Sequence, residues 1–136
     1  MNKLGIANEQ DIENIEVKLV EYKMGILSSS FTFNEEELNL TYIRKLHGLL
    51  FGDIYYGAGN FSSRINEETI TRANRIISDI CYMLEYINYD EIRILIQEKL
   101  RELIGLQLFD DGNNRVINCY YNLLTEPYIK NKERGR

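Results

Sequence analysis

Apolar side chains recur three or four positions apart through most of this chain, and only one proline, Pro127, stands in the sequence. Such spacing places the apolar side chains on one face of an α-helix. A hydrophobic share of 44% over 136 residues excludes disorder as the main state and suffices for the core of one domain. The pattern therefore predicts a single, mainly helical domain that spans residues 1–136.

Two helices are expected in the first fifty residues. Asn8 can cap the first helix, with Asp11 in its opening turn. The stretch SSSFTF, residues 28–33, interrupts the pattern, and Asn34 followed by three glutamates predicts the start of the second helix. The buried stripe expected in the first helix consists of Ile12, Ile15, Leu19, Tyr22 and Ile26. The apolar face expected in the second helix consists of Leu38, Ile43, Leu46 and Leu50.

Three further helices are expected after an irregular stretch, residues 52–66, whose three glycines predict a loop with a short hairpin. A long helix follows Asn66 and reaches about Tyr89, and Asp90 can cap the next one. The last helix, RVINCYYNLL (115–124), should end before Pro127, because a proline disfavours the helical conformation of the residue before it. The expected core positions are Ile70, Ala73, Ile77, Ile80, Leu84 and Ile87, followed by Ile94, Ile96, Leu100, Leu103 and Ile104.

The charge of the chain and its cysteines restrict the class of protein. A formal net charge of -5 argues against a nucleic-acid binder, which needs clustered Lys and Arg. The basic end of the chain predicts a flexible tail from about residue 129. Cys81 and Cys119 lie in apolar helical stretches without metal-type spacing and are expected to be reduced core residues. With neither a secretion signal nor an apolar run that could cross a bilayer, we expect a cytoplasmic protein that binds no membrane, and the sequence leaves export as an effector open.

The stretch LQLFDDGNNR, residues 106–115, has the composition of an anion-binding turn. Gly112 lets the backbone approach an anion closely, and the N–H groups that open the next helix lack intrahelical partners. Arg115 adds a fork of donors suited to phosphate oxygens, and Asp111 can hold Mg²⁺ together with substrate phosphates. The same residue types also form ordinary turns between helices, and the glycines fit neither a P-loop nor a dinucleotide fold. The residues alone leave a metal–polyphosphate site and a plain turn both open.

Two stretches in order resemble the Fic family. LHGLLFGDIYYGAGNFSSR, residues 46–64, resembles the pattern by which Fic proteins enter their core: a helix with a His and Leu-Phe, then Asp-Ile-Tyr, then Ala-Gly. QLFDDGNNR, residues 107–115, is similar to the family's active-site motif HxFx[DE]GN[GK]R. The opening NKLGI followed by a helix is also similar, so the resemblance covers nearly the whole chain.

The resemblance implies a compact all-α Fic-like domain with a short β-hairpin flap at about residues 57–66. Family members transfer AMP, or less often another phosphate-containing group, to a protein hydroxyl. The implied cofactors are therefore Mg²⁺ and ATP or another nucleotide. The implied partner is a target or regulatory protein that docks at the flap by strand-type pairing. The flap positions are Gly59, Asn60, Phe61, Ser62 and Ser63.

The resemblance also implies a role for each position of the motif at residues 107–115. Phe109 would be a buried anchor, Asp111 the Mg²⁺ ligand, and Arg115 the contact to the outer phosphate of the nucleotide. The phosphate-binding helix entrance would be formed by Gly112, Asn113 and the neighbouring Asn114.

Gln107 stands where the family has its general base, a histidine. An amide cannot usefully accept a proton near neutral pH, and losing a general base costs typically about 10²–10⁴-fold in rate. Positioning and charge neutralisation can survive that loss. We therefore expect a nucleotide-binding relative that is weakly active or inactive. The alternatives are a non-enzymatic interaction or regulatory module, and an active transferase or hydrolase in which Gln107 orients the nucleophile.

Two other residues are possible substitutes for the missing base. His47, the only histidine, occupies a family position in the helix before the flap, so we expect a packing or hydrogen-bonding role. Asp110 lies closer to the motif, but an exposed loop carboxylate is a weak proton acceptor near neutral pH. The sequence leaves the nucleotide, the target protein and the oligomeric state open.

Overall fold

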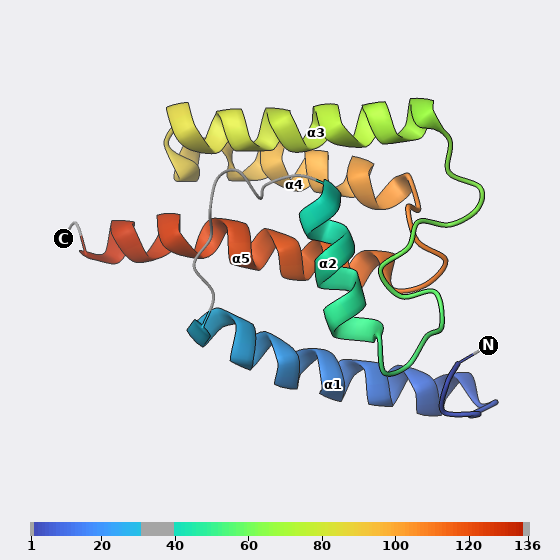
Figure 1. Ribbon diagram of the computed structural model, residues 1–136. Helices are drawn as coiled ribbons and strands as arrows, with labels where there is room; N and C mark the ends of the chain where they lie inside the picture. The colour runs from blue at the N-terminus through green and yellow to red at the C-terminus, as the bar shows by residue number, and fades with distance from the viewer. Residues whose placement is uncertain (1, 31–39, 135–136) are drawn as a thin grey trace.

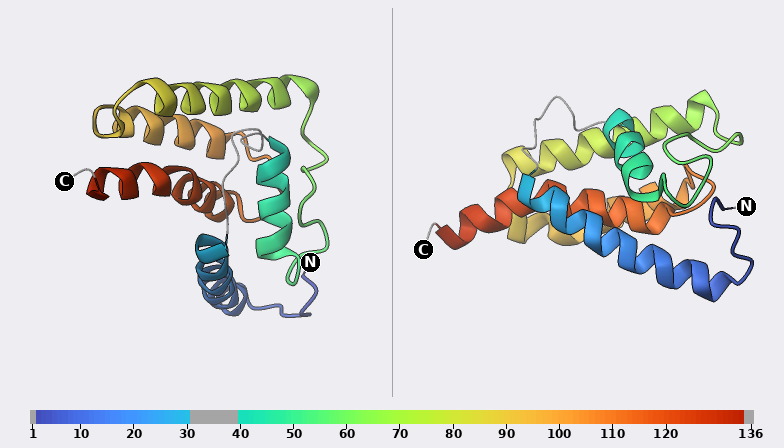
Figure 2. Two further views of the ribbon diagram at one scale, coloured as in Figure 1. Left: turned by 60° about the vertical axis from the view of Figure 1, so that its left-hand side comes forward. Right: turned by 60° about the horizontal axis from the view of Figure 1, so that its bottom comes forward.

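The computed structural model describes residues 2–30 and 40–134, which form five α-helices. They are α1 (Glu9–Ser30), α2 (Leu40–Phe51), α3 (Glu67–Tyr86), α4 (Tyr89–Gly105) and α5 (Asn113–Arg134). Helices α3, α4 and α5 run side by side, and α2 crosses them (Figures 1 and 2). The described residues contain no strand, only an isolated bridge between Asn2 and Tyr55. The predicted all-α class is confirmed.

The core lies between α2, α3, α4 and α5. In α3 the predicted positions Ala73, Ile77, Ile80 and Leu84 are buried, and Ile87, which follows the helix, is exposed. In α4 the prediction of Ile94 as a core residue is wrong, because the buried face consists of Ile92, Ile96, Leu100 and Leu103. Position 94 lies about half a turn from both 92 and 96 and so faces outward. The helix is capped by Asn88, which accepts a hydrogen bond from the N–H of Asp90, rather than by Asp90 itself.

Helix α1 lies against α2 and α5 on the outside of the bundle (Figure 1). Asn8 caps it as predicted and accepts hydrogen bonds from the N–H groups of Gln10 and Asp11. The predicted stripe is only half-buried at Ile12, Ile15 and Leu19, and the prediction is wrong at Tyr22 and Ile26, which are exposed, because this outer helix is covered on a narrow strip only. The helix continues to Ser30, so SSS belongs to it, and the expected start of the next helix at Asn34 lies outside the described residues.

Helix α5 does not end before Pro127, as the sequence predicted, but continues to Arg134. A proline removes one intrahelical N–H bond, and a helix whose other bonds hold can pass through it. The tail expected from about residue 129 is therefore helical up to Arg134. Among the described residues, no helix has the length and apolar character required of a membrane span.

The predicted hairpin at residues 57–66 is wrong. The N–H of Asn60 bonds to the carbonyl of Gly57 and that of Ile65 to the carbonyl of Ser62, so short turns occupy the groups that a hairpin would pair. Asn66 then caps α3 by accepting a hydrogen bond from the N–H of Thr69. Residues 52–66, the bend before α5 and the N-terminal residues lie at the same end of the molecule (Figure 1).

Both cysteines are reduced, as predicted. Cys119 is buried, and burial raises its pKa to about 11, so it stays protonated at neutral pH. Cys81 is partly buried against the core.

Candidate functional site

The chain bends through residues 106–112 between α4 and α5, and two residues there have positive φ angles. Gln107 has φ 50° and Gly112 has φ 77°. The N–H of Gln107 bonds to the carbonyl of Ile104 at 3.0 Å. One of the carbonyl groups in the last turn of α4 thereby gains a hydrogen-bond partner, as in a left-handed C-cap. Glycine is the usual residue there, and a residue with a Cβ is strained by about 1–2 kcal/mol. The bend thus holds an exposed glutamine in a conformation that it does not favour.

Phe109 anchors the bend in the core, where 1% of its surface is exposed. The side chain of Asn113 closes the turn: its Oδ1 accepts a hydrogen bond from the N–H of Phe109 at 2.9 Å, and its Nδ2 donates to the Phe109 carbonyl at 2.7 Å. Because Oδ1 and one N–H of Nδ2 bind the bend itself, Asn113 can offer an anion its backbone N–H and the second N–H of Nδ2. Asn114 is exposed beside it at the start of α5.

Gly112 lies directly against α2. A Cβ at this position would come within 2.7 Å of the Phe51 ring, and Phe51 is fully buried and therefore confined. The bend consequently needs glycine at position 112 both for space and for its φ angle.

His47 joins the bend to the loop at residues 52–66. Its Nδ1 accepts a hydrogen bond from the N–H of Gly59 at 2.9 Å, so the proton is assigned to Nε2, which donates to the Asp111 carbonyl at 2.8 Å. Its ring stacks on the Phe109 ring, with the two ring centroids 3.9 Å apart. Burial lowers the pKa of His47 below 6.5, which favours this neutral form. The predicted packing and hydrogen-bonding role is confirmed.

The residues expected to form the flap support the bend instead. The N–H of Ser62 donates to the Leu108 carbonyl at 2.8 Å, and Phe61 lies 5.6 Å from Phe109, between ring centroids. Arg44 donates to the Gly59 carbonyl and to the side chain of Asn60. Ser63 is exposed.

Arg115 is paired with two carboxylates of α1. Its guanidinium lies 3.7 Å from Glu13 and 3.6 Å from Glu16. Glu16 is 8% exposed and also accepts a hydrogen bond from the Tyr55 hydroxyl. A phosphate that binds Arg115 must therefore displace these two carboxylates or share the guanidinium with them.

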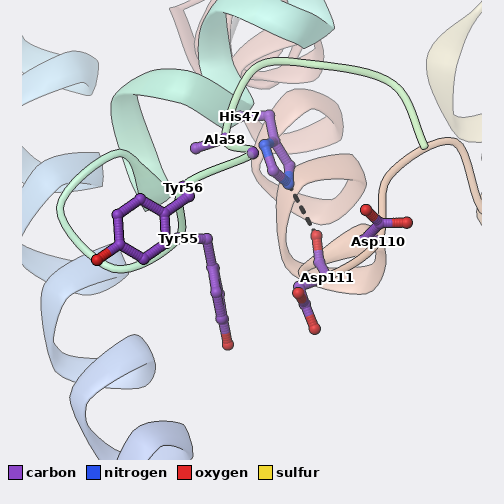
Figure 3. A pocket seen from close by; sticks show the side chains of 7 residues that line it. His47, Tyr55, Tyr56, Ala58, Asp110 and Asp111 are labelled. Atoms are coloured by element: carbon purple, nitrogen blue, oxygen red, sulfur yellow. Dashed lines mark hydrogen bonds between the residues drawn. The ribbon is translucent and has the colours of Figure 1, made fainter. Parts of the chain in front are cut away.

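Three adjoining hollows meet at Asp111. The tyrosine recess, about 270 Å³, is lined by His47, Tyr55, Tyr56, Gly57, Ala58, Asp110 and Asp111 (Figure 3). The motif hollow, about 380 Å³, is lined by Glu16, Ile104, Gln107, Asp110, Asp111, Gly112, Asn113, Asn114 and Arg115. The acidic hollow, about 460 Å³, is lined by Asn2, Ile6, Ala7, Glu9, Ile12, Glu13, Glu16, Tyr55, Asp111 and Arg115. The predicted residues Gln107, Asp111, Gly112 and Arg115 thus share one hollow.

The fit of Mg²⁺ to this site depends on a phosphate. No group of three or more His, Cys, Asp or Glu side chains that could hold a metal occurs in the described part of the chain. Mg²⁺ often takes one or two carboxylates and completes its shell with waters and substrate phosphates. The carboxylate of Asp111 suits that mode of binding and not a metal held by protein alone.

Three residues of the site were not predicted from the sequence: Glu13, Glu16 and Tyr55. Glu16 follows Ile12 by four positions and precedes Leu19 by three, so it falls on the apolar stripe of α1. A carboxylate on such a face needs a partner, and this signal was available in the sequence. Nothing in the sequence indicates that the partner is Arg115, about a hundred positions away.

The comparisons with known proteins give no family for this chain. No family model matches the sequence, and no curated protein is significantly similar to it.

Proposed function

We propose that this chain is a Fic-like nucleotide-binding protein in which transfer of AMP, or of another phosphate-containing group, to a protein hydroxyl is weak or absent. One observation carries the proposal: Asp111, Gly112 and Arg115 share the motif hollow at the start of α5 with Gln107, the residue in place of the family's base. In such a protein the nucleotide pocket is retained and the proton acceptor is absent.

In this proposal the phosphates lie at the start of α5. The first N–H groups of the helix and its dipole attract the anion, and Gly112 allows it to approach the backbone. Bound Mg²⁺ would supply charge neutralisation between Asp111 and the phosphates. Arg115 would exchange at least one of its carboxylate partners for a phosphate oxygen.

Gln107 sets the limit on the rate. Its amide can hydrogen-bond an incoming hydroxyl and orient it, but it cannot remove the proton. With the remaining positioning intact, transfer would be slower than with a histidine by about 10²–10⁴-fold. Gln107→His, alone or together with Asn114→Gly, should therefore raise transfer of label from α-labelled ATP to protein.

Calorimetry with ATP, ADP and GTP in the presence of Mg²⁺ tests the retained pocket. We expect micromolar binding that weakens at least tenfold in Arg115→Ala and in Asp111→Asn, whereas Arg101→Ala, on exposed α4 surface, is the matched control. Transfer from α-labelled ATP as fast as in an intact Fic enzyme would contradict the loss of the base. If that transfer disappeared in Gln107→Ala, it would support the alternative of an active enzyme with a changed mechanism.

A second candidate is a non-enzymatic interaction module on the same scaffold. The pairing of Arg115 with Glu13 and Glu16 favours this second candidate, because the two carboxylates already neutralise the guanidinium that a phosphate would need. The aromatic surface beside the site, with Tyr56 72% exposed, offers contact area for a protein. Absence of nucleotide binding at millimolar concentration would support this candidate over the first.

A further inference from the structure

The tyrosine recess adjoins the motif hollow and shares Asp110 and Asp111 with it. In Figure 3, Tyr55 and Tyr56 lie on one side of the recess, Asp110 and Asp111 lie on the other, and His47 lies above them. A volume of about 270 Å³ is below the usual size of a complete ligand pocket, which starts at about 300 Å³. The recess therefore suits one part of a ligand whose remainder lies in a neighbouring hollow.

The two tyrosines give this recess an aromatic wall. Tyr55 is held in place, because its hydroxyl donates to the buried Glu16 and its ring lies 6.2 Å from that of Phe51. Tyr56 is 72% exposed, and Nζ of Lys3 lies 5.7 Å from its ring centroid, so the ring face away from Lys3 is accessible to a ligand. Flat aromatic faces of this kind attract planar rings, including nucleobases.

Asp110 supplies a hydrogen-bond acceptor on the opposite side. It is exposed, and within the described residues it makes no hydrogen bond or ion pair. An ionised carboxylate only accepts hydrogen bonds, and its two oxygens fit two neighbouring donors best. Of the common bases, guanine presents two such donors side by side, its ring N1–H and its 2-amino group. Adenine presents one amino group next to a ring nitrogen that is itself an acceptor and would face the carboxylate unfavourably.

We propose that the tyrosine recess binds the guanine base of a nucleotide, with the ring against Tyr55 and Tyr56 and its donor edge on Asp110. This inference rests on the proposed nucleotide binding at the start of α5 and specifies the base. The contact at Asp110 makes the protein a guanine-nucleotide binder that discriminates against adenine.

Calorimetry of the whole chain with Mg²⁺ tests the assignment with four probes: GTP, ITP, ATP and inorganic tripolyphosphate. ITP differs from GTP only by the missing 2-amino group, so it should bind about tenfold or more weakly, the loss of one hydrogen bond to a charged group. ATP should bind more weakly by at least the same factor. Tripolyphosphate should show the affinity that remains without any base.

Variants of the recess sharpen the test. Asp110→Asn should remove the preference for GTP over ITP and favour XTP, because xanthine carries a carbonyl where guanine carries its amino group and an amide can donate to it. Tyr56→Ala should weaken the binding of GTP about tenfold through lost stacking, and Tyr56→Phe should bind GTP as tightly as the wild type does. Glu98→Gln, which alters an exposed acid on α4, is the matched control and should change nothing.

Equal affinities for GTP, ITP and ATP would overturn the guanine site and leave the proposed nucleotide binding standing. An unchanged GTP preference in Asp110→Asn would overturn the role of that carboxylate and the proposal with it. If neither tripolyphosphate nor any nucleotide bound at millimolar concentration, the proposed function would itself fall and the base site with it.

Discussion

Gly112→Ala should destabilise the fold severely, since two independent strains meet at this position. A Cβ there would lie 2.7 Å from two carbons of the Phe51 ring, and Phe51 is fully buried, with the His47 ring 4.9 Å away. Forcing an extra methyl group into a packed core costs about 1–3 kcal/mol. Holding a residue with a Cβ in the left-handed conformation costs about 1–2 kcal/mol more. The free energy of unfolding should thus fall by about 2–5 kcal/mol, a large share of the roughly 5–15 kcal/mol typical of a domain.

Urea unfolding followed by circular dichroism measures this loss, and a thermal melt should show a midpoint lowered by roughly 3–4 °C for each kcal/mol. Gly105→Ala is the matched control. A Cβ at Gly105, the last residue of α4, meets nothing within 4 Å, so the exchange should be neutral or stabilising by up to about 1 kcal/mol. If Gly112→Ala unfolded at the same urea concentration as the wild type, the tight contact between the bend and Phe51 would be refuted.

Three further predictions concern the same end of the molecule. His47→Leu leaves an N–H and a carbonyl of the two loops unpaired and should lower the free energy of unfolding by about 2–5 kcal/mol in urea titrations. Because burial holds the pKa of His47 below 6.5, the unfolded chain binds the proton more readily. The stabilisation should therefore be complete above pH 6.5 and decline as the pH falls from 6.5 toward the folded-state pKa, and in His47→Leu this part of the pH dependence should vanish. Glu16→Gln removes one carboxylate from Arg115 and should tighten binding of Mg²⁺–ATP roughly threefold to tenfold by calorimetry, whereas unchanged or weaker binding would show that the pair does not compete with phosphate. Gln107→Gly should raise the unfolding midpoint, because it relieves the strain of about 1–2 kcal/mol at φ 50°, and an unaltered or lower midpoint would contradict that strain.

The helices were predictable from the sequence because apolar spacing directly reflects which face is buried. The prediction failed in α4, where the apolar residues fit two alternative buried faces, one with Ile92 and one with Ile94. It also failed at Tyr22 in α1, because this outer helix has neighbours on one side only. Sequence patterns report that an element has an apolar face, but the number of elements packed against it is a property of the tertiary structure. The predicted end of α5 before Pro127 was wrong for a related reason, since the conformational preference of one residue is weak against the remaining hydrogen bonds of a long helix.

The sequence predicted where the candidate site lies, but it did not predict most of the contacts within the site. Gly112 has a positive φ angle, which glycine in a turn readily adopts, and Phe109 is buried as expected of an anchor. The turns that replace the expected hairpin, and the bonds of the Asn113 side chain to Phe109, were not predictable, because both depend on which partners the folded chain brings near. The same holds for Glu16, whose pairing with Arg115 spans the chain from α1 to α5.

The bend is held by contacts that do not involve the side chain of Gln107. His47, Gly112 and Asn113 fix its backbone from three sides, and the amide of Gln107 remains exposed in the motif hollow. Gln107→His should consequently leave the fold unchanged, because histidine tolerates the left-handed conformation at φ 50° at least as well as glutamine does. The variant therefore separates two causes of low activity. If it folds, binds nucleotide and gains transfer, the missing base was the whole defect, whereas binding without transfer points to Arg115 and its carboxylates. In that second case, adding Glu16→Gln to Gln107→His should produce the transfer that neither change gives alone, and failure of the double variant would refute both explanations.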